Sequence, residues 1–301
     1  MSTSFPERRA EALEVALEGP IEGASSASAA ARERALAGGV KPRRWGSWYI
    51  AEHRIRGQRS YYQTIIATSI GNPLVYLFAL GVGLAALVPQ GIPNGATTIS
   101  YLAFVAPALL ATAAVTVAAE ESTYPFMMGF KWNPIFFAMN AAPLSGSQVA
   151  NGMFIAILAR ILPTTAIYFV VMLFFGAVPS GWGILGIASA SVTGLAIAAV
   201  VASYTSRIEE DKGQMAMIMR FGITPMFLFS GTFFPLESLP WFLQWIGWIS
   251  PLWHGTQLGR VAAYGLDEPA WLTAVHIVYL LALTFLGWVA TQRVITRRLN
   301  K

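Results

Sequence analysis

The sequence predicts an all-α integral membrane protein with six transmembrane helices, an interfacial helix before the first, and an external re-entrant helical hairpin between the fifth and sixth. Hydrophobic residues make up 55% of the chain and charged residues only 12%, and the mean hydropathy is +0.54. A soluble chain of 301 residues with this composition would expose too much apolar surface to water. Each apolar stretch can cross a hydrocarbon core of about 30 Å, which takes about 20 helical residues. The stretches are 61–88, 101–119, 149–178, 183–204, 215–234 and 271–289.

The basic residues give the orientation of these spans. With six crossings, one face receives Lys41, Arg43, Arg44, Arg54, Arg56, Arg59, Lys131, Arg207, Lys212, Arg293, Arg297, Arg298 and Lys301. The other face receives 89–100, 179–182 and 235–270, whose only basic residue is Arg260. Because Lys and Arg in short loops stay in the cytoplasm, both termini are predicted to be cytoplasmic and the protein to lie in the cell inner membrane. The net charge of +5 comes from these flanks, so we expect membrane lipids and no nucleic acid as partners.

The segments before the first span differ in composition. Residues 1–40 are rich in Ala, Ser and Glu and have no apolar run after a basic start, so they do not form a signal peptide. We expect a mostly disordered cytoplasmic tail, and the alternative is a pair of short amphipathic helices at 6–17 and 29–36. Residues 41–60 interleave Trp and Tyr with Arg, which favours an interfacial amphipathic helix over a merely basic flank. The six-helix transmembrane domain then occupies 61–301.

Two features inside the spans bear on packing and function. The fourth span is crowded with Ala, Gly and Ser, which let helix backbones approach closely, and it is predicted to be central. Arg160 and Arg220 lie within the third and fifth spans, where a charge is expensive. Two interpretations stay open: the arginines snorkel to the cytoplasmic face, or they line a cavity or pair with Glu120 and Glu121 at the end of the second span.

The external segment 231–266 is nearly as apolar as a span, but Pro235, Pro240 and Pro251 divide it into pieces of about ten residues. Such pieces are too short to cross the hydrocarbon core, so they predict a re-entrant or interfacial hairpin. Its marker residues are Phe233, Phe234, Pro235, Trp241, Trp245 and Trp248. The three tryptophans share one helical face, as is typical of indoles at a membrane boundary.

The cytoplasmic loop 121–148 between the second and third spans is rich in aromatic residues. A short helix over 133–142 is a candidate docking element for a soluble subunit, because aromatic anchors concentrate binding energy at interfaces. The alternative is an amphipathic helix that rests on lipid. The candidate docking residues are Trp132, Asn133, Phe136 and Phe137.

The order of these elements, together with three segments, resembles the permeases of ABC-2 type transporters, especially the nodulation-type and antibiotic-resistance exporter permeases. The segments are YLAFVAPALLATAAVTVAAEESTYP at 101–125, NAAPLSGSQVANG at 140–152 and SGTFFPLESLPWFLQWIGWISPLWHGTQLGR at 230–260. The resemblance covers roughly 45–301, and the last segment, with its Phe-Phe-Pro, Leu-Pro and Pro-Leu pattern, is the most specific.

The resemblance implies an exporter of two permease copies, most simply a homodimer, and two ABC ATPase subunits that bind ATP and Mg. It also implies that the aromatic loop is a coupling helix seated in a cleft of each ATPase. From their places in the second and fifth spans, Phe104, Met217, Phe221 and Phe227 are predicted to line the path of an amphipathic substrate. A drug, a lipid and a lipid-linked glycan all fit this description.

The chain is predicted to be a non-catalytic transport subunit with no cofactor of its own. It has no Gly-x-x-x-x-Gly-Lys-Ser/Thr phosphate loop. It has no cysteine, and His53, His254 and His276 are scattered without the spacing of metal ligands, so no metal site and no catalytic residue are predicted. The residues alone leave two alternatives, an ATP-independent secondary transporter and a membrane-embedded enzyme or scaffold.

Overall fold

The computed structural model describes residues 22–84, 86 and 90–301. The chain divides into two compact units, Met1–Trp45 and Gly46–Lys301. Helix α2 (Glu22–Gln58) begins in the first unit, and Trp45 interrupts it with non-helical backbone angles (φ −115°, ψ 15°). Residues 22–40 are therefore helical where the sequence predicts a mostly disordered tail, because their many alanines favour helix. The predicted helix at 6–17 lies outside the described residues.

Within the described residues, five helices are long and apolar enough to cross a membrane: Ala29–Gly81, Tyr101–Trp132, Gly146–Phe174, Gly181–Thr205 and Ala270–Leu299. A shorter apolar helix covers Gln214–Phe229, where the sequence predicts the fifth span. The prediction of a predominantly helical membrane protein is confirmed. The elements that form these helices are α3 (Tyr62–Phe78), α4 (Tyr101–Met127), α6 (Gly146–Phe174), α7 (Leu185–Thr205), α8 (Gln214–Met217), α9 (Thr224–Phe229) and α12 (Ala270–Leu299).

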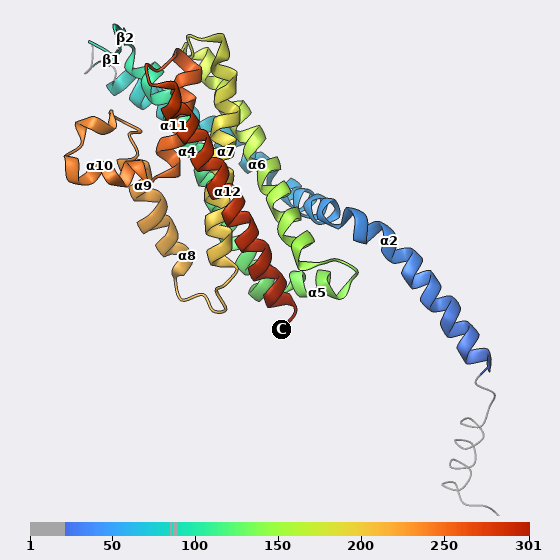
Figure 1. Cartoon of the computed structure of the whole chain (residues 1–301). Helices are drawn as coiled ribbons and strands as arrows, with labels where there is room; N and C mark the ends of the chain where they lie inside the picture. Colours follow the sequence, from blue (N-terminus) through green and yellow to red (C-terminus); the bar gives the residue numbers. More distant parts are fainter. Residues whose placement is uncertain (1–21, 85, 87–89) are drawn as a thin grey trace, which may run out of the picture. The chain divides into compact units, whose positions relative to one another are not determined.

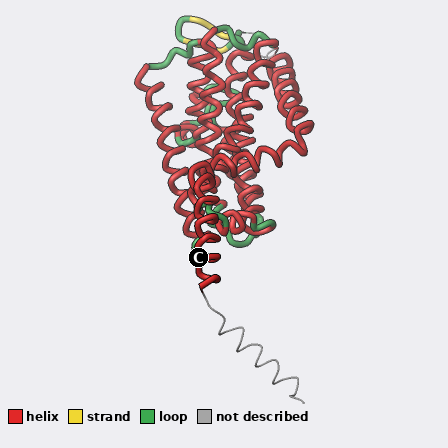
Figure 2. The backbone as a smooth tube through the Cα atoms, turned by 90° about the vertical axis from the view of Figure 1, so that its right-hand side faces the viewer, coloured by secondary structure: helices red, strands yellow, loops and turns green. Residues whose placement is uncertain are grey.

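Within the described residues, a short strand pair precedes α4. Strands β1 (Ile92–Asn94) and β2 (Thr97–Ile99) pair antiparallel, with Asn94 opposite Thr97. Gly95 and Ala96 form the two-residue turn, and Gly95 at its first position has a positive φ of 55°. The Asn94 side chain donates to the Gly265 carbonyl (3.2 Å) and accepts from the Asp267 amide (2.9 Å). Figures 1 and 2 show this hairpin at one end of the helix bundle, and Figure 1 shows α5 (Ile135–Ala141) and the C-terminus at the other.

Helix α7 is the centre of the bundle, since it packs against α4, α6, α12 and α11 (Pro251–Tyr264). Small residues make these contacts close: a Cβ atom added at Gly255 of α11 would collide with Thr193, and one added at Gly287 of α12 would collide with Ala199. The Ser189 hydroxyl also donates to the Gly255 carbonyl at 2.7 Å. The predicted central place of the fourth span is confirmed.

In the part of the chain that the structure describes, three π-helical segments adjoin the membrane helices. They are η2 (Ala79–Leu84) after α3, η4 (Met128–Trp132) after α4, and η6 (Ile218–Ile223) between α8 and α9. The fifth predicted span is thus built from three short pieces and ends at Phe229. A π-helical turn widens a helix and often occurs at functional sites.

The segment after α9 folds into a helical hairpin whose pieces begin at the prolines. Helix α10 (Trp241–Trp248) follows Pro240, and α11 begins with Pro251. A short 3-10 turn, η7 (Leu236–Ser238), follows Pro235. A hydrogen bond of 2.6 Å between the hydroxyls of Ser230 and Ser250 joins the two ends of the α10 segment.

The close contact of α11 with α7 predicts a specific sensitivity. Gly255→Ala should lower the stability of the purified protein by about 1–3 kcal/mol, because the added methyl overlaps Thr193 in a packed interface. Thermal unfolding in detergent measures this change as a lower midpoint. Gly71→Ala in α3 is the matched control, because nothing lies within 4 Å of its new Cβ. Equal midpoints for the two variants would contradict the packing argument.

Candidate functional site: a charged cavity between membrane helices

A cavity of about 410 Å³ lies between α3, α4, α6 and the η6–α9 segment. It brings together three charged residues that the sequence places in separate spans: Glu120, Arg160 and Arg220. Asn72, Thr112, Thr116 and Thr164 add polar groups, and Tyr76, Leu109, Ile223 and Phe227 add apolar and aromatic surface. The cavity therefore offers both a charged region and an apolar wall.

Arg160 points away from the cytoplasmic end predicted for its helix. Its guanidinium donates to Thr164 Oγ1 at 3.3 Å, one turn farther along α6. Thr164 in turn donates to the Arg160 carbonyl, and its hydroxyl lies 3.3 Å from Ser69 of α3. A snorkelling arginine would extend toward the start of α6 at Gly146 instead. This geometry favours the cavity-lining interpretation of Arg160.

The sequence leaves open whether Arg160 pairs with Glu120 or Glu121, and no such ion pair forms within 4 Å. Glu121 forms an ion pair with Arg54 at 3.0 Å, and both side chains are largely buried. Successive residues of a helix point about 100° apart, so Glu121 faces α2 while Glu120 faces the cavity. In the described part of the chain, neither Arg160, Arg220 nor Glu120 has an ion-pair partner within 4 Å.

Only one of the four predicted substrate-path residues lines the cavity. Phe227 does so, and its ring packs against Phe233 (4.9 Å between centroids). Met217 and Phe221 lie on the exposed face of the fifth span, at 57% and 75% exposure. Phe104 is buried elsewhere because the Arg260 guanidinium stacks on its ring at 3.7 Å. Placement in the second and fifth spans does not determine which way each ring faces.

The predicted docking residues divide into surface and anchor residues. Trp132 and Phe137 are 53% and 42% exposed, and Asn133 is exposed beside them. Phe136 is instead 3% exposed, because its ring packs edge-on against Phe126 and Phe130. The structure corrects the prediction for Phe136: this ring fixes α5 to the bundle, and its neighbours form the surface.

The loop 121–148, which carries these residues and is called the predicted docking loop below, is also tied to the end of the last helix. Asn140 of α5 donates to the Leu299 carbonyl at 3.2 Å. The Arg298 guanidinium lies over the Phe130 ring at 4.0 Å and donates to the carbonyls of Ser206 (2.8 Å) and Ile208 (2.7 Å). Arg298 therefore joins the predicted docking loop, the end of α7 and α12. From the sequence alone, Arg298 is only one of the predicted cytoplasmic charges.

At the opposite side of the bundle, Arg260 holds the hairpin against α4. Its side chain is 3% exposed and donates to the carbonyls of Phe104 (3.2 Å) and Gly231 (2.7 Å) and to Gln257 Oε1 (3.0 Å). Burial lowers the pKa of Arg260 to about 10, so the group stays charged at neutral pH. It is the only basic residue of the predicted external segments, and its role is structural.

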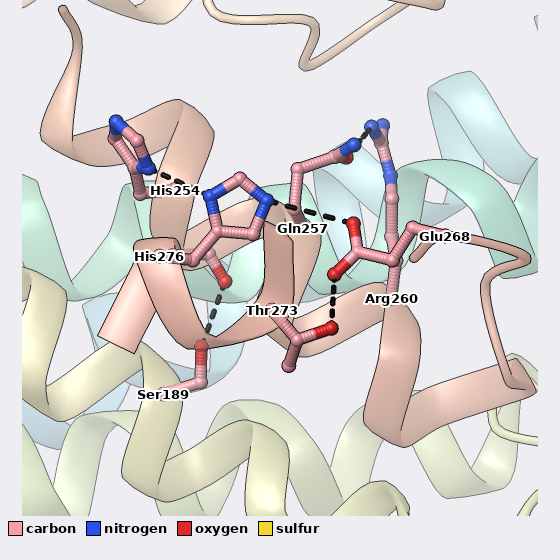
Figure 3. A network of polar contacts seen from close by, with 8 residues as sticks. Ser189, His254, Gln257, Arg260, Glu268, Thr273 and His276 are labelled. Atoms are coloured by element: carbon pink, nitrogen blue, oxygen red, sulfur yellow. Dashed lines mark hydrogen bonds and ion pairs between the residues drawn. The ribbon is translucent and has the colours of Figure 1, made fainter. Parts of the chain in front are cut away.

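Figure 3 shows a buried polar chain between α11 and α12 that sequence spacing does not reveal. His254 Nδ1 lies 2.7 Å from His276 Nδ1, and His254 Nε2 lies 3.0 Å from the Trp248 carbonyl. A carbonyl only accepts, so His254 Nε2 donates and its Nδ1 accepts from His276. His276 Nε2 faces Glu268 at 3.5 Å, and Thr273 donates to the same carboxylate at 2.6 Å.

The surroundings of this row of hydrogen-bonded side chains determine the charges of His254 and Glu268. Burial and the neighbouring His276 lower the pKa of His254 to about 4, so His254 is neutral at pH 7. Burial raises the pKa of Glu268, but the nearby His276 and the hydrogen bond from Thr273 outweigh this effect and leave the pKa below its ordinary value. Within the described residues, no group of three His, Asp or Glu side chains is arranged to hold a metal ion.

The hairpin's marker residues are mostly on the surface. Trp241, Trp245 and Trp248 of α10 are 82%, 53% and 54% exposed. Phe234 is exposed, while Phe233 is half-buried and its carbonyl accepts a hydrogen bond from Tyr101 at 3.0 Å. Helix α10 thus presents a row of indoles on one face.

Comparison with known proteins gives consistent matches. The sequence model described as "ABC-2 type transporter" matches residues 50–264. Nodulation protein J of Rhizobium leguminosarum bv. viciae is 28% identical over 262 residues, which cover 82% of this chain and 93% of the relative. Nodulation protein J of Neorhizobium galegae is 28% identical over 236 residues, 77% and 86% of the two chains. The protein of the same name in Sinorhizobium fredii is 27% identical over 251 residues, 81% and 91%.

The buried histidine predicts a pH dependence of stability. The folded-state pKa of His254 is lowered, so the unfolded chain binds the extra proton first as the pH falls below about 6.5. Stability should therefore be constant above that pH and decrease from 6.5 toward 4, by about 3 kcal/mol in total. Thermal midpoints across this range measure the effect. His254→Gln should flatten the curve, whereas the control His53→Gln at an exposed position should not.

Proposed function

The chain belongs to the ABC-2 type transporter family, and from this premise we propose that it is the permease subunit of an ATP-driven exporter. In this proposal it moves an amphipathic substrate outward across the cytoplasmic membrane. The family match and the nodulation protein J relatives support a membrane transport permease. The observation that carries the finer proposal is the cavity, because a charged region beside aromatic residues suits a molecule with a polar and an apolar part.

The proposed energy source is a separate ABC ATPase, present in two copies with two copies of this permease. ATP and Mg would be bound by that ATPase, and the absence of a phosphate loop from this sequence supports the division of labour. ATP binding would draw the ATPase pair together. The predicted docking loop would transmit this movement to the permease helices.

The exposed surface around α5 supports the proposed docking site. Trp132 and Phe137 present aromatic area at the end of the bundle that also carries the C-terminus, shown in Figure 1. Phe136 and Asn140 hold the same loop to the bundle. A surface that binds a partner and is rigidly anchored can pass a displacement to α4 and α12.

A proposed second permease copy would use the apolar face that α3 and the fifth span leave uncovered. Ile66, Ile70 and Leu74 recur every four residues along α3 and are all exposed. Phe221 is exposed on the neighbouring segment. In a dimer this face and the cavity beside it would meet their counterparts in the second copy, while the remaining apolar surface would contact lipid.

We also propose six crossings with both termini in the cytoplasm of the inner membrane, and a re-entrant α10–α11 hairpin on the external side. The positions in Figure 1 support this topology: α5 and the C-terminus lie at one end, and β1 and β2 at the other. Helix α10 has only 8 residues, too few to cross the hydrocarbon core.

The docking proposal predicts the effect of a surface charge. Trp132→Glu should abolish binding of the ATPase subunit encoded beside the permease, because it places a carboxylate where an aromatic contact is expected. Co-purification and substrate-stimulated ATP hydrolysis measure the loss, and membrane insertion should be unchanged. Trp182→Glu is the control, since Trp182 is 73% exposed and lies in the predicted external loop 179–182. Undiminished ATPase association in the Trp132 variant would contradict the proposal.

The topology predicts where a thiol reagent reaches the chain. The sequence has no cysteine, so Asn300→Cys and Trp182→Cys each carry a single thiol. A membrane-impermeant maleimide added to intact cells should label the Trp182 variant and leave the Asn300 variant unlabelled until the cells are opened. Labelling of the Asn300 variant in intact cells would mean an odd number of crossings.

A further inference from the structure

We propose that the cavity between α3, α4, α6 and η6 binds the anionic headgroup of an amphipathic molecule, with Arg160 and Arg220 as the recognising cations. This inference rests on the proposed function, because it names the substrate class of the same permease. A phosphate group is the headgroup that the geometry fits most simply. The apolar part of the molecule would lie along Tyr76 and Phe227.

The wall of the cavity carries more positive than negative charge. It holds two guanidinium groups and a single carboxylate, Glu120. In the described part of the chain, none of the three has an ion-pair partner within 4 Å. An excess positive charge at membrane depth is costly, and an anion that enters the cavity lowers this cost.

Arg160 and Arg220 also have hydrogen-bond donors that no residue of the described chain uses. A guanidinium carries five N–H donors, and Arg160 uses one of them, toward Thr164. Arg220 makes no hydrogen bond to any residue that the structure describes. Most donors of both side chains are therefore free for a ligand. Planar forks of this kind match the oxygen atoms of phosphate and carboxylate groups.

The charged region and the apolar region of the cavity are separated along the helices. Arg220 and Phe227 lie about two turns apart along the fifth span, and Glu120 lies about three turns from Leu109 along α4. The aromatic residues Tyr76 and Phe227 contact each other edge-on at 6.5 Å between centroids. A volume of about 410 Å³ holds a headgroup and the first part of an apolar chain.

The test is a binding assay on the full-length permease in nanodiscs of phosphatidylcholine, without ATPase. Dodecyl phosphate is the anionic probe, and dodecyl maltoside and dodecyltrimethylammonium are its neutral and cationic counterparts. Dodecyl phosphate should bind at least about tenfold more tightly than the other two. Equal affinity for the three probes would overturn the proposal. Displacement of dodecyl phosphate by inorganic phosphate at equal concentration would also overturn it, because it would indicate a site for free anions.

Variants locate the binding to the cavity. Arg160→Gln and Arg220→Gln should each weaken dodecyl phosphate binding about tenfold, and Glu120→Gln should strengthen it several-fold by removing the competing negative charge. Arg207→Gln, at an exposed position outside the cavity, is the matched control and should bind as the unmodified protein does. Unchanged binding in the Arg220 variant, whose side chain is exposed and not needed for packing, would overturn the proposal even if the Arg160 variant failed to fold.

The assay separates this inference from the proposed function. Selective anion binding without ATP-driven transport would leave the cavity assignment standing and refute the exporter. ATP-driven transport without selective anion binding would support the exporter and refute the assignment of the cavity as an anion site.

Discussion

The close packing of α7 against four other helices is the constraint on which the rest of this structure depends. In a bilayer the hydrophobic effect does not drive apolar helices together, so van der Waals contacts and interhelical hydrogen bonds must stabilise their association. Gly255 and Gly287 allow that contact, and Ser189 and Thr291 add hydrogen bonds from one helix to the backbone of another. The α3 helix and the fifth span are not among the principal neighbours of α7. The cavity forms between these peripheral elements and the α4–α6 wall of the bundle.

Much of this fold can be predicted from the sequence because the bilayer imposes long apolar stretches and segregated charges. The central place of 183–204 follows from its small residues, and the divisions of the hairpin follow from Pro240 and Pro251. The differences arise where local signals compete. The alanines of 22–40 favour helix more strongly than their polar neighbours oppose it, and Gly95 with Ala96 forms the turn of a strand hairpin inside a loop expected to have no strands. A glycine at the first position of a two-residue turn is a signal that could have predicted β1 and β2.

The candidate site is only partly predictable, because its residues are far apart in the sequence. Arg160, Arg220 and Glu120 stand out individually as charges in apolar stretches, but their meeting in one cavity depends on how three helices pack. The roles of aromatic residues are harder to predict, because composition does not distinguish a buried ring that holds the loop, such as Phe136, from an exposed one, such as Trp132. The contact between His254 and His276 has no signal at all, because the residues lie 22 positions apart on different helices.

Helix α12 connects the two ends of the helix bundle. Near its start, Thr273 donates a hydrogen bond to Glu268, and His276 lies between Glu268 and His254 of the hairpin. In its middle, Thr291 and Gly287 lie against α7. At its end, Arg298 and the Leu299 carbonyl hold the predicted docking loop. The helix has 30 residues and no internal proline, so it spans about 45 Å without a built-in hinge. The fifth span, by contrast, is divided by a π-helical segment that contains Arg220. In the proposed exporter, a displacement of the predicted docking loop would therefore pass along α12 as a rigid movement, and the η6 wall of the cavity would be the element that changes its winding.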